Sequence, residues 1–113
     1  MQLEAKTYLF DIGQAGNHLF AFTAGRTRED YLADAYLRSA VERQLEIIGE
    51  ATSKLAKLDP ATATKITDYR KLISFRNVLI HGYADIDDEL VWDLIQTKLA
   101  LLLDEVRGLQ AAT

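Results

Sequence analysis

Apolar residues recur at intervals of three and four along almost the whole chain, a spacing that places them on one side of an α-helix. Four stretches show this spacing, with stripes that begin at Tyr8, Leu37, Leu72 and Val91. A single proline and six glycines in 113 residues leave too few turn positions for a β-sandwich or barrel. The sequence therefore predicts an all-α fold.

Residues that cap or stop helices mark the expected boundaries in the first half of the chain. Gly25 is expected to end the first helix. Asp30 is expected to cap a short helix, and Asp34 the next long one. That long helix is expected to end at Asp59-Pro60, because a residue before proline avoids the α-helical region.

The second half of the chain is expected to form two more long helices. One is predicted over about residues 63–80, with Gly82 as its exit. The other follows the acidic run at residues 85–89, whose charges complement the start of a helix. The expected architecture is one domain, residues 1–113, built as an antiparallel bundle of four long helices plus one short helix.

The apolar stripe of the last helix is wide for a bundle of this size. Leu101, Leu102 and Leu103 cannot all face one partner helix. A wide apolar surface on a small domain favours a further interface, so we expect a homodimer. The alternative is a monomer with ordinary surface leucines.

Several classes of protein and site are excluded or disfavoured by composition. Cysteine is absent, which excludes disulfides, thiol catalysis and iron–sulfur clusters. With only His18 and His81, a multi-histidine metal site in one chain is not expected, and we expect no cofactor. The longest apolar run, residues 99–103, is far shorter than the ~18 residues of a membrane span. No signal peptide is expected either, so a cytoplasmic protein is predicted. A net charge of −4 disfavours a nucleic-acid binder without excluding a local basic cleft.

Polar side chains of distinct chemistry gather at one apolar helix end, residues 74–83. Arg76 offers a planar cation suited to phosphate, and His81 can exchange protons near neutral pH. Asn77 lies one helical turn before His81, so it can orient the imidazole. Ribonucleolytic transesterification needs a group that moves protons and a cation that stabilises the transition state. His81 and Arg76 could supply both without a metal.

The spacing of this pair leaves two interpretations open. Arg76 and His81 lie about 140° apart around a helix that turns ~100° per residue. They can meet at one phosphate only if a cleft wraps around the helix end or a second chain contributes. In the structural alternative, Arg76 pairs with a surface acid, His81 caps the helix C-terminus and Tyr83 belongs to the core.

Three segments resemble the HepT-like branch of the HEPN superfamily. Residues 76–83, Arg-Asn-Val-Leu-Ile-His-Gly-Tyr, resemble its Arg-x4-His-x-Tyr motif. Residues 45–51, LEIIGEA, and 87–92, DDELVW, resemble two further family segments. The three occur in the family's order, and together they extend the resemblance over nearly the whole chain.

This resemblance implies a toxin of a toxin–antitoxin pair. HepT-like toxins are metal-independent endoribonucleases, all-helical and dimeric, whose motifs line a cleft between two chains. The resemblance makes Arg76 and His81 the RNA-cleaving pair, with Asn77 at the family's polar position. The implied partner is an MntA-type nucleotidyltransferase antitoxin that transfers AMP to Tyr83. AMP beside Arg76 would repel and occlude an incoming RNA phosphate.

Two further sets of charged residues are assigned to this site. Lys65, Arg70 and Lys71 form a local basic patch that we expect to follow an RNA backbone, although a solvated helix face is the alternative. One acid of the LEIIGEA segment is expected to orient Arg76 or His81 across the packed helices. We favour Glu46 over Glu50 for this role, and the alternative makes both ordinary surface acids near Arg43 and Lys54.

The sequence leaves two other functions open. The chain could be a non-catalytic HEPN module that binds a nucleotide and assembles with a nucleotidyltransferase. The intact pair of Arg76 and His81 favours the ribonuclease over this module. A purely structural helical dimer would leave Arg76, Asn77, His81 and Tyr83 without a joint explanation.

Overall fold

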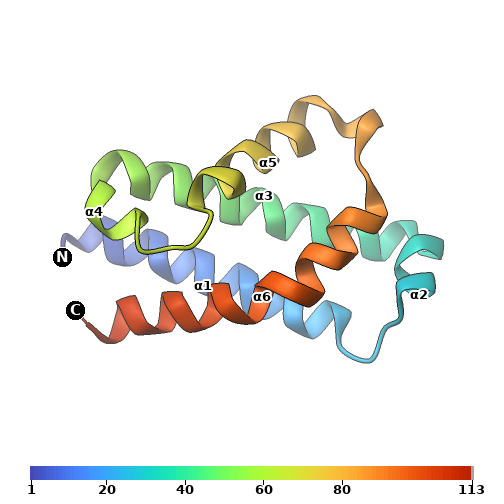
Figure 1. Ribbon diagram of the computed structural model, residues 1–113, viewed down its shortest axis with the longest axis horizontal. Coiled ribbons are helices and arrows are strands. Elements are labelled where there is room, and N and C mark those ends of the chain that lie inside the picture. The colour runs from blue at the N-terminus through green and yellow to red at the C-terminus, as the bar shows by residue number, and fades with distance from the viewer. Residues whose placement is uncertain (113) are drawn as a thin grey trace.

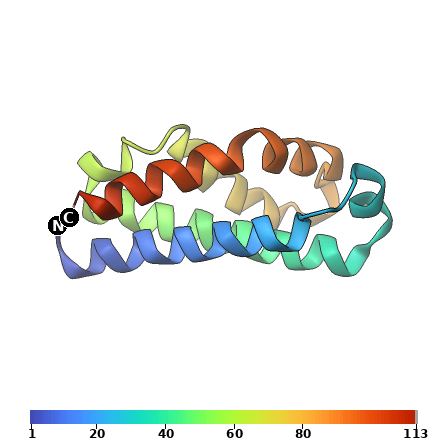
Figure 2. The same ribbon diagram turned by 90° about the horizontal axis from the view of Figure 1, so that it is seen from below.

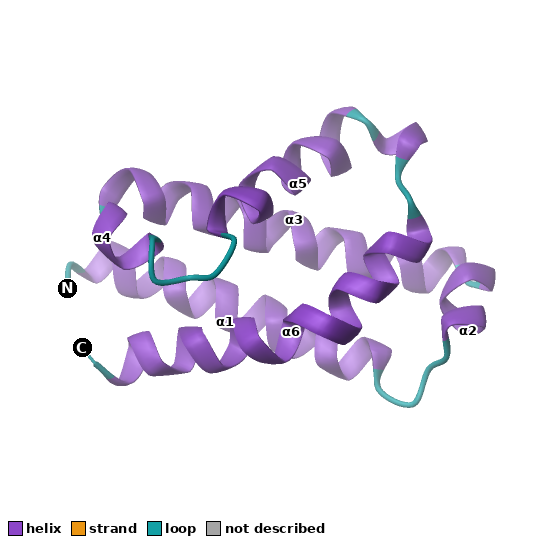
Figure 3. Ribbon diagram, in the orientation of Figure 1, coloured by secondary structure: helices purple, strands orange, loops and turns teal. Residues whose placement is uncertain are grey.

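Helices make up most of residues 1–112, the part of the chain that the computed structural model describes, and no strand occurs in that range. The four long helices are α1 (Leu3–Thr23), α3 (Ala35–Leu58), α5 (Tyr69–His81) and α6 (Asp88–Ala111). The connections hold two short helices and one 3-10 turn: α2 (Arg28–Ala33), α4 (Pro60–Ala63) and η1 (Tyr83–Asp85). Successive long helices run in opposite directions, and the two ends of the chain lie close together (Figures 1 and 2). The predicted all-α antiparallel bundle is confirmed, as the colouring by secondary structure also shows (Figure 3).

The segment between α3 and α5 differs from the expected continuous helix over residues 63–80. Asp59 caps the short helix α4, because its carboxylate accepts hydrogen bonds from the backbone N–H and the hydroxyl of Thr62 at 3.2 and 2.7 Å. The chain then turns, and Asp68 adopts a left-handed conformation with φ 58° and ψ 30°. An α-helix cannot contain that conformation. Helix α5 therefore begins only at Tyr69.

Capping residues define the boundaries on either side of α2. Thr27, not Asp30, is the N-cap of α2: its hydroxyl accepts from the Asp30 N–H at 3.1 Å. The Asp30 carboxylate accepts from the Thr27 N–H at 2.9 Å, which completes a capping box. Asp34 caps α3 as predicted, since it accepts from the Leu37 N–H at 3.1 Å. Asp87 likewise caps the predicted acidic start of α6.

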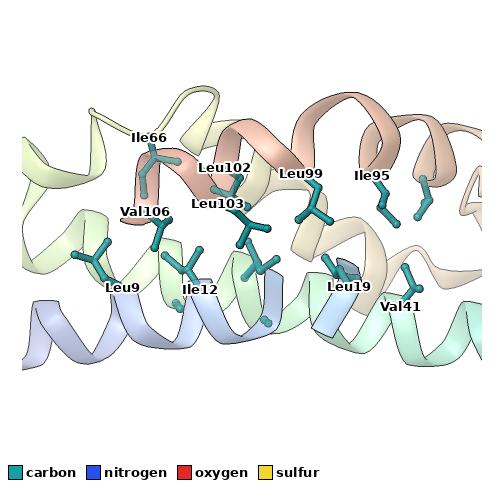
Figure 4. Close-up of a cluster of buried hydrophobic side chains, with 14 of the residues drawn as sticks. Leu9, Ile12, Leu19, Val41, Ile66, Ile95, Leu99, Leu102, Leu103 and Val106 are labelled. Atoms are coloured by element: carbon teal, nitrogen blue, oxygen red, sulfur yellow. The ribbon is translucent and has the colours of Figure 1, made fainter. Parts of the chain in front are cut away.

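The hydrophobic core lies between α1, α3 and α6 (Figure 4). Most of its buried side chains come from the predicted stripes, with Ile12 and Leu19 on α1, Val41 and Ile48 on α3, and Leu99 and Val106 on α6. Leu9 and Leu103 are also buried, although they lie outside those stripes. Full burial of such a side chain contributes roughly 1.5–3 kcal/mol. No helix within residues 1–112 has the length and apolar character needed to cross a membrane.

Helix α5 packs mainly against α3, and an apolar groove of about 380 Å³ runs between α5 and α6. Leu72 and Phe75 line the groove from α5, and Leu94 and Leu101 line it from α6. Leu101 is 44% exposed, whereas the two leucines that follow it are buried. A single chain therefore leaves part of the wide α6 stripe uncovered.

A partly buried polar cluster joins α2, α3 and the start of α6. Tyr31 is buried against Trp92, with ring centroids 5.5 Å apart. Its hydroxyl has no hydrogen-bond partner among the described residues. Burial is the main cause that raises the pKa of the Tyr31 phenol, and the negative charges of Glu42 and Asp88 raise it further. Glu42 and Asp88 are both partly buried, and Arg38, which lies 3.5 Å from Asp88, partly offsets their effect on the pKa of Tyr31.

Replacing Glu42 with glutamine is expected to stabilise the protein near neutral pH. Burial is the main cause that raises the pKa of Glu42 above its ordinary value, and the charge of Asp88 raises it further. The stability that such a carboxyl contributes is present below its unfolded-state pKa and is lost as pH rises through its folded-state pKa. Thermal unfolding of Glu42→Gln should therefore occur at a higher temperature than wild type at about pH 7, with a smaller gain at about pH 4.

Glu46→Gln, one helical turn further along α3, is the matched control for this measurement. Glu46→Gln is not expected to raise the unfolding temperature in the same pH-dependent way. A gain for Glu42→Gln that is as large at the acidic pH as at the neutral one would contradict the account.

Candidate functional site

Arg76 lies on the face of α5 that packs against α3, and its side chain is 32% exposed. Its Nη2 is 2.8 Å from Oε2 of Glu50 on α3. Its Nη1 lies 3.5 Å from the side-chain oxygen of Asn77. Its Nε is buried and has no hydrogen-bond partner within residues 1–112. The guanidinium is thus held along one edge by a carboxylate from the neighbouring helix.

Gly49 permits this close contact between α3 and α5. A Cβ added at Gly49 would collide with the Cβ of Arg76 and would lie 2.9 Å from the carbonyl oxygen of Leu72. Glycine is used where two backbones approach this closely. The dipeptide Gly49-Glu50 therefore supplies both the short distance between the helices and the carboxylate that binds Arg76.

A small charged pocket of about 190 Å³ surrounds Arg76 between α1, α3 and α5. Its walls carry charges of both signs, from Asp11, Arg43, Glu46, Glu50, Lys54 and Arg76. Glu46 pairs with Arg43 at 3.2 Å, and Glu50 also lies 3.6 Å from Lys54. The acid that meets Arg76 is therefore Glu50, whereas Glu46, the residue favoured from the sequence, contacts Arg43.

His81 is the last residue of α5 and is exposed to solvent. Gly82 caps the helix, with its N–H donating to the carbonyl oxygen of Val78 at 2.8 Å. Asn77, one turn before His81, is also exposed. Arg76 packs against α3, whereas His81 is exposed and lies about 140° away around a helix that turns ~100° per residue, so one chain holds the two on different faces of α5. Within the described residues, no group of three or more histidine, aspartate or glutamate side chains could hold a metal ion.

Tyr83 opens the 3-10 turn after α5, and it is 75% exposed. This exposure contradicts the structural alternative in which Tyr83 belongs to the core. One other feature of that alternative is present, because Arg76 pairs with an acid. His81 lies in the last turn of α5, but the residue that caps the helix is Gly82. The hydroxyl of Tyr83 is accessible to another macromolecule.

The three expected RNA-binding residues do not form one continuous track. Arg70 shares an exposed face of α5 with Asn77 and His81, within about 40° around the axis. Lys71 instead lines the groove toward α6 and lies 3.9 Å from Asp68. Lys65 is exposed in the turn before α5. The structure therefore places Arg70 with His81 and separates it from Lys71.

Comparison with known protein families tests the resemblance that residues 45–51, 76–83 and 87–92 indicate. The model of a family described as "Ribonuclease HepT-like" matches residues 12–109. The chain belongs to the HepT-like family. The match spans all four long helices and includes Arg76, His81 and Tyr83.

Named relatives of this HepT-like chain agree with the family match. It is 31% identical over 103 residues to "Putative RNase MJ1380" of Methanocaldococcus jannaschii, which covers 91% of this chain and 94% of the relative. It is 32% identical over 102 residues to "Probable ribonuclease HepT" of Thermococcus cleftensis, which covers 90% and 92%. No solved structure gives a significant match. The names of these relatives support a ribonuclease role.

Proposed function

We propose that this HepT-like protein is a metal-independent endoribonuclease toxin of a HepT/MntA-type toxin–antitoxin system. The observation that carries the proposal is the complete Arg-x4-His-x-Tyr segment at the accessible end of α5 in a HepT-like chain. Arg76 is anchored there by a carboxylate, while His81 and Tyr83 are exposed.

The chemistry follows from the two side chains. The 2′-oxygen of a ribose attacks the adjacent phosphorus, and His81 accepts the proton of the 2′-hydroxyl. The bond between phosphorus and the 5′-oxygen breaks, and a histidinium returns a proton to that oxygen. The products are a 2′,3′-cyclic phosphate and a 5′-hydroxyl. Arg76 stabilises the negative charge that builds up on the phosphate oxygens in the transition state.

A homodimer is part of this proposal, because one chain holds Arg76 and His81 on different faces of α5. In a symmetric dimer the His81 of one chain can face the Arg76 of its partner across a shared cleft. The exposed apolar groove between α5 and α6 supports a further interface in solution. Arg70 is exposed on the same face of α5 as His81, where it can contact the RNA backbone.

A cleavage assay in the presence of EDTA tests the ribonuclease activity. The purified protein should cut single-stranded RNA and leave 2′,3′-cyclic phosphate ends without added metal. Cleavage that requires a divalent cation, or the absence of any cleavage, would contradict the proposal.

The alternative, a non-catalytic module that binds a nucleotide, has less support from the structure. The pocket beside Arg76 holds about 190 Å³, below the roughly 300–1,000 Å³ of typical small-molecule sites. Tight ATP binding without RNA cleavage would favour this module.

Adenylylation of Tyr83 is expected when the protein is incubated with an MntA-type nucleotidyltransferase and ATP. The hydroxyl oxygen attacks the α-phosphorus of ATP, and pyrophosphate leaves. Intact mass should rise by whole AMP units in wild type and remain unchanged in Tyr83→Phe. The modified protein should lose RNA cleavage, because AMP adds bulk and negative charge near the motif.

Tyr36→Phe is the matched control, since Tyr36 is 88% exposed but lies at the start of α3. This variant should still gain AMP. An unaltered mass gain in Tyr83→Phe would show that another residue is the acceptor.

A further inference from the structure

Glu50 is the acid that reaches across from α3 to the guanidinium of Arg76. We propose that Glu50 is a positioning residue, which holds Arg76 in the orientation that stabilises the cleaved phosphodiester. This inference rests on the proposed ribonuclease function and adds a residue to its site.

The geometry of the pair suits this role. The distance of 2.8 Å between Nη2 and Oε2 is typical of a charge-assisted hydrogen bond. The two residues belong to different helices, so the bond ties a long, flexible side chain to the rigid part of the bundle. Glu50 occupies only part of the fork of donors on Arg76, which leaves other N–H groups to bind a phosphate.

The Nε–H group of Arg76 is buried and has no hydrogen-bond partner within residues 1–112. An N–H group without a partner is costly when it is shielded from water. An unrestrained arginine on a surface helix would avoid this cost by turning its guanidinium into solvent. The ion pair with Glu50 offsets the cost and keeps the side chain against α3.

Lys54 helps to hold the carboxylate of Glu50 in place, and Gly49 allows α3 and α5 to pack closely. Lys54 lies one helical turn after Glu50, with its Nζ 3.6 Å from the other carboxylate oxygen. Gly49 brings α5 close enough for the contact between Glu50 and Arg76. The carboxylate is therefore bound from two sides, which limits its own movement.

A purely electrostatic role for Glu50 gives the opposite expectation. If Glu50 only weakened the positive charge of Arg76, its neutralisation would strengthen RNA binding and accelerate cleavage. If Glu50 positions Arg76, neutralisation should slow the chemical step even though RNA binds equally well or more tightly.

The test is steady-state RNA cleavage by Glu50→Gln, with Glu46→Gln as the control on the same helix. We expect kcat to fall about ten-fold or more in Glu50→Gln, with KM unchanged or lower. Glu50→Asp should retain part of the activity. Glu46→Gln should cleave at the wild-type rate, because Glu46 contacts Arg43 and not Arg76.

A second readout does not depend on cleavage. The Nε–Hε group of Arg76 should give a distinct, slowly exchanging NMR signal in wild type, which averages toward that of a free arginine in Glu50→Gln. An unchanged kcat, or an unchanged Arg76 signal, would overturn the positioning role. Absence of cleavage by wild type would instead count against the proposed function, while the NMR signal would still report whether Glu50 holds Arg76.

Discussion

Replacing either Arg76 or His81 with alanine is expected to lower the rate of RNA cleavage by about 10²–10⁴-fold. In the proposed mechanism, His81 supplies proton transfer and Arg76 supplies the positive charge that the transition state needs. Neither loss should unfold the protein, because His81 is exposed and Arg76 is partly exposed. The measurement is single-turnover cleavage of a labelled RNA, with thermal unfolding recorded in parallel.

His18→Ala is the matched control for these two variants. His18 is the other histidine of the chain, and it lies on α1 with its Nδ1 3.2 Å from Oε1 of Gln44. Cleavage by His18→Ala should match wild type. Cleavage that persists in His81→Ala, in a preparation free of other nucleases, would remove His81 from the mechanism.

Gly49→Ala is expected to destabilise the bundle by about 1–3 kcal/mol, since the new Cβ overpacks the contact between α3 and α5. The added methyl group would meet the Cβ of Arg76 and the carbonyl oxygen of Leu72. Relief requires α5 to move away from α3. We expect the unfolding temperature to fall by roughly 4–13 °C, and cleavage to fall further as Arg76 leaves Glu50.

Gly108→Ala is expected to have the opposite effect on the stability of the protein. Gly108 lies within α6, and a Cβ there would meet nothing within 4 Å. Alanine should therefore stabilise this helix by about 0.5–1 kcal/mol. If Gly49→Ala were as stable as Gly108→Ala, the close contact between α3 and α5 would not exist as described.

The helices and most of their ends could be predicted from local sequence signals. The caps at Asp34 and Asp87 lie next to the helices they start, so their effect is visible without tertiary structure. The start of α5 could not be predicted in this way, because the apolar pattern continues through a turn. Ile66 is buried in that turn, and Asp68, with its left-handed conformation, directly precedes the helix.

The contacts of the candidate site residues could be predicted only in part from the sequence. The separation of Arg76 and His81 around one helix follows from helical geometry alone. The choice between Glu46 and Glu50 does not, because it depends on which turn of α3 meets α5. Gly49 is an available signal, because a glycine inside a helix permits a close backbone approach, and its neighbour Glu50 lies at such an approach.

In the proposed dimer, Arg76 of one chain and His81 of the other form each cleavage site. Mixing the inactive Arg76→Ala and His81→Ala proteins under conditions that allow subunit exchange tests it directly. In a mixed dimer one of the two shared sites regains both side chains, so activity should return to about a quarter of the wild-type level. Mixtures that remain inactive, although mass spectrometry shows that mixed dimers have formed, would contradict the claim.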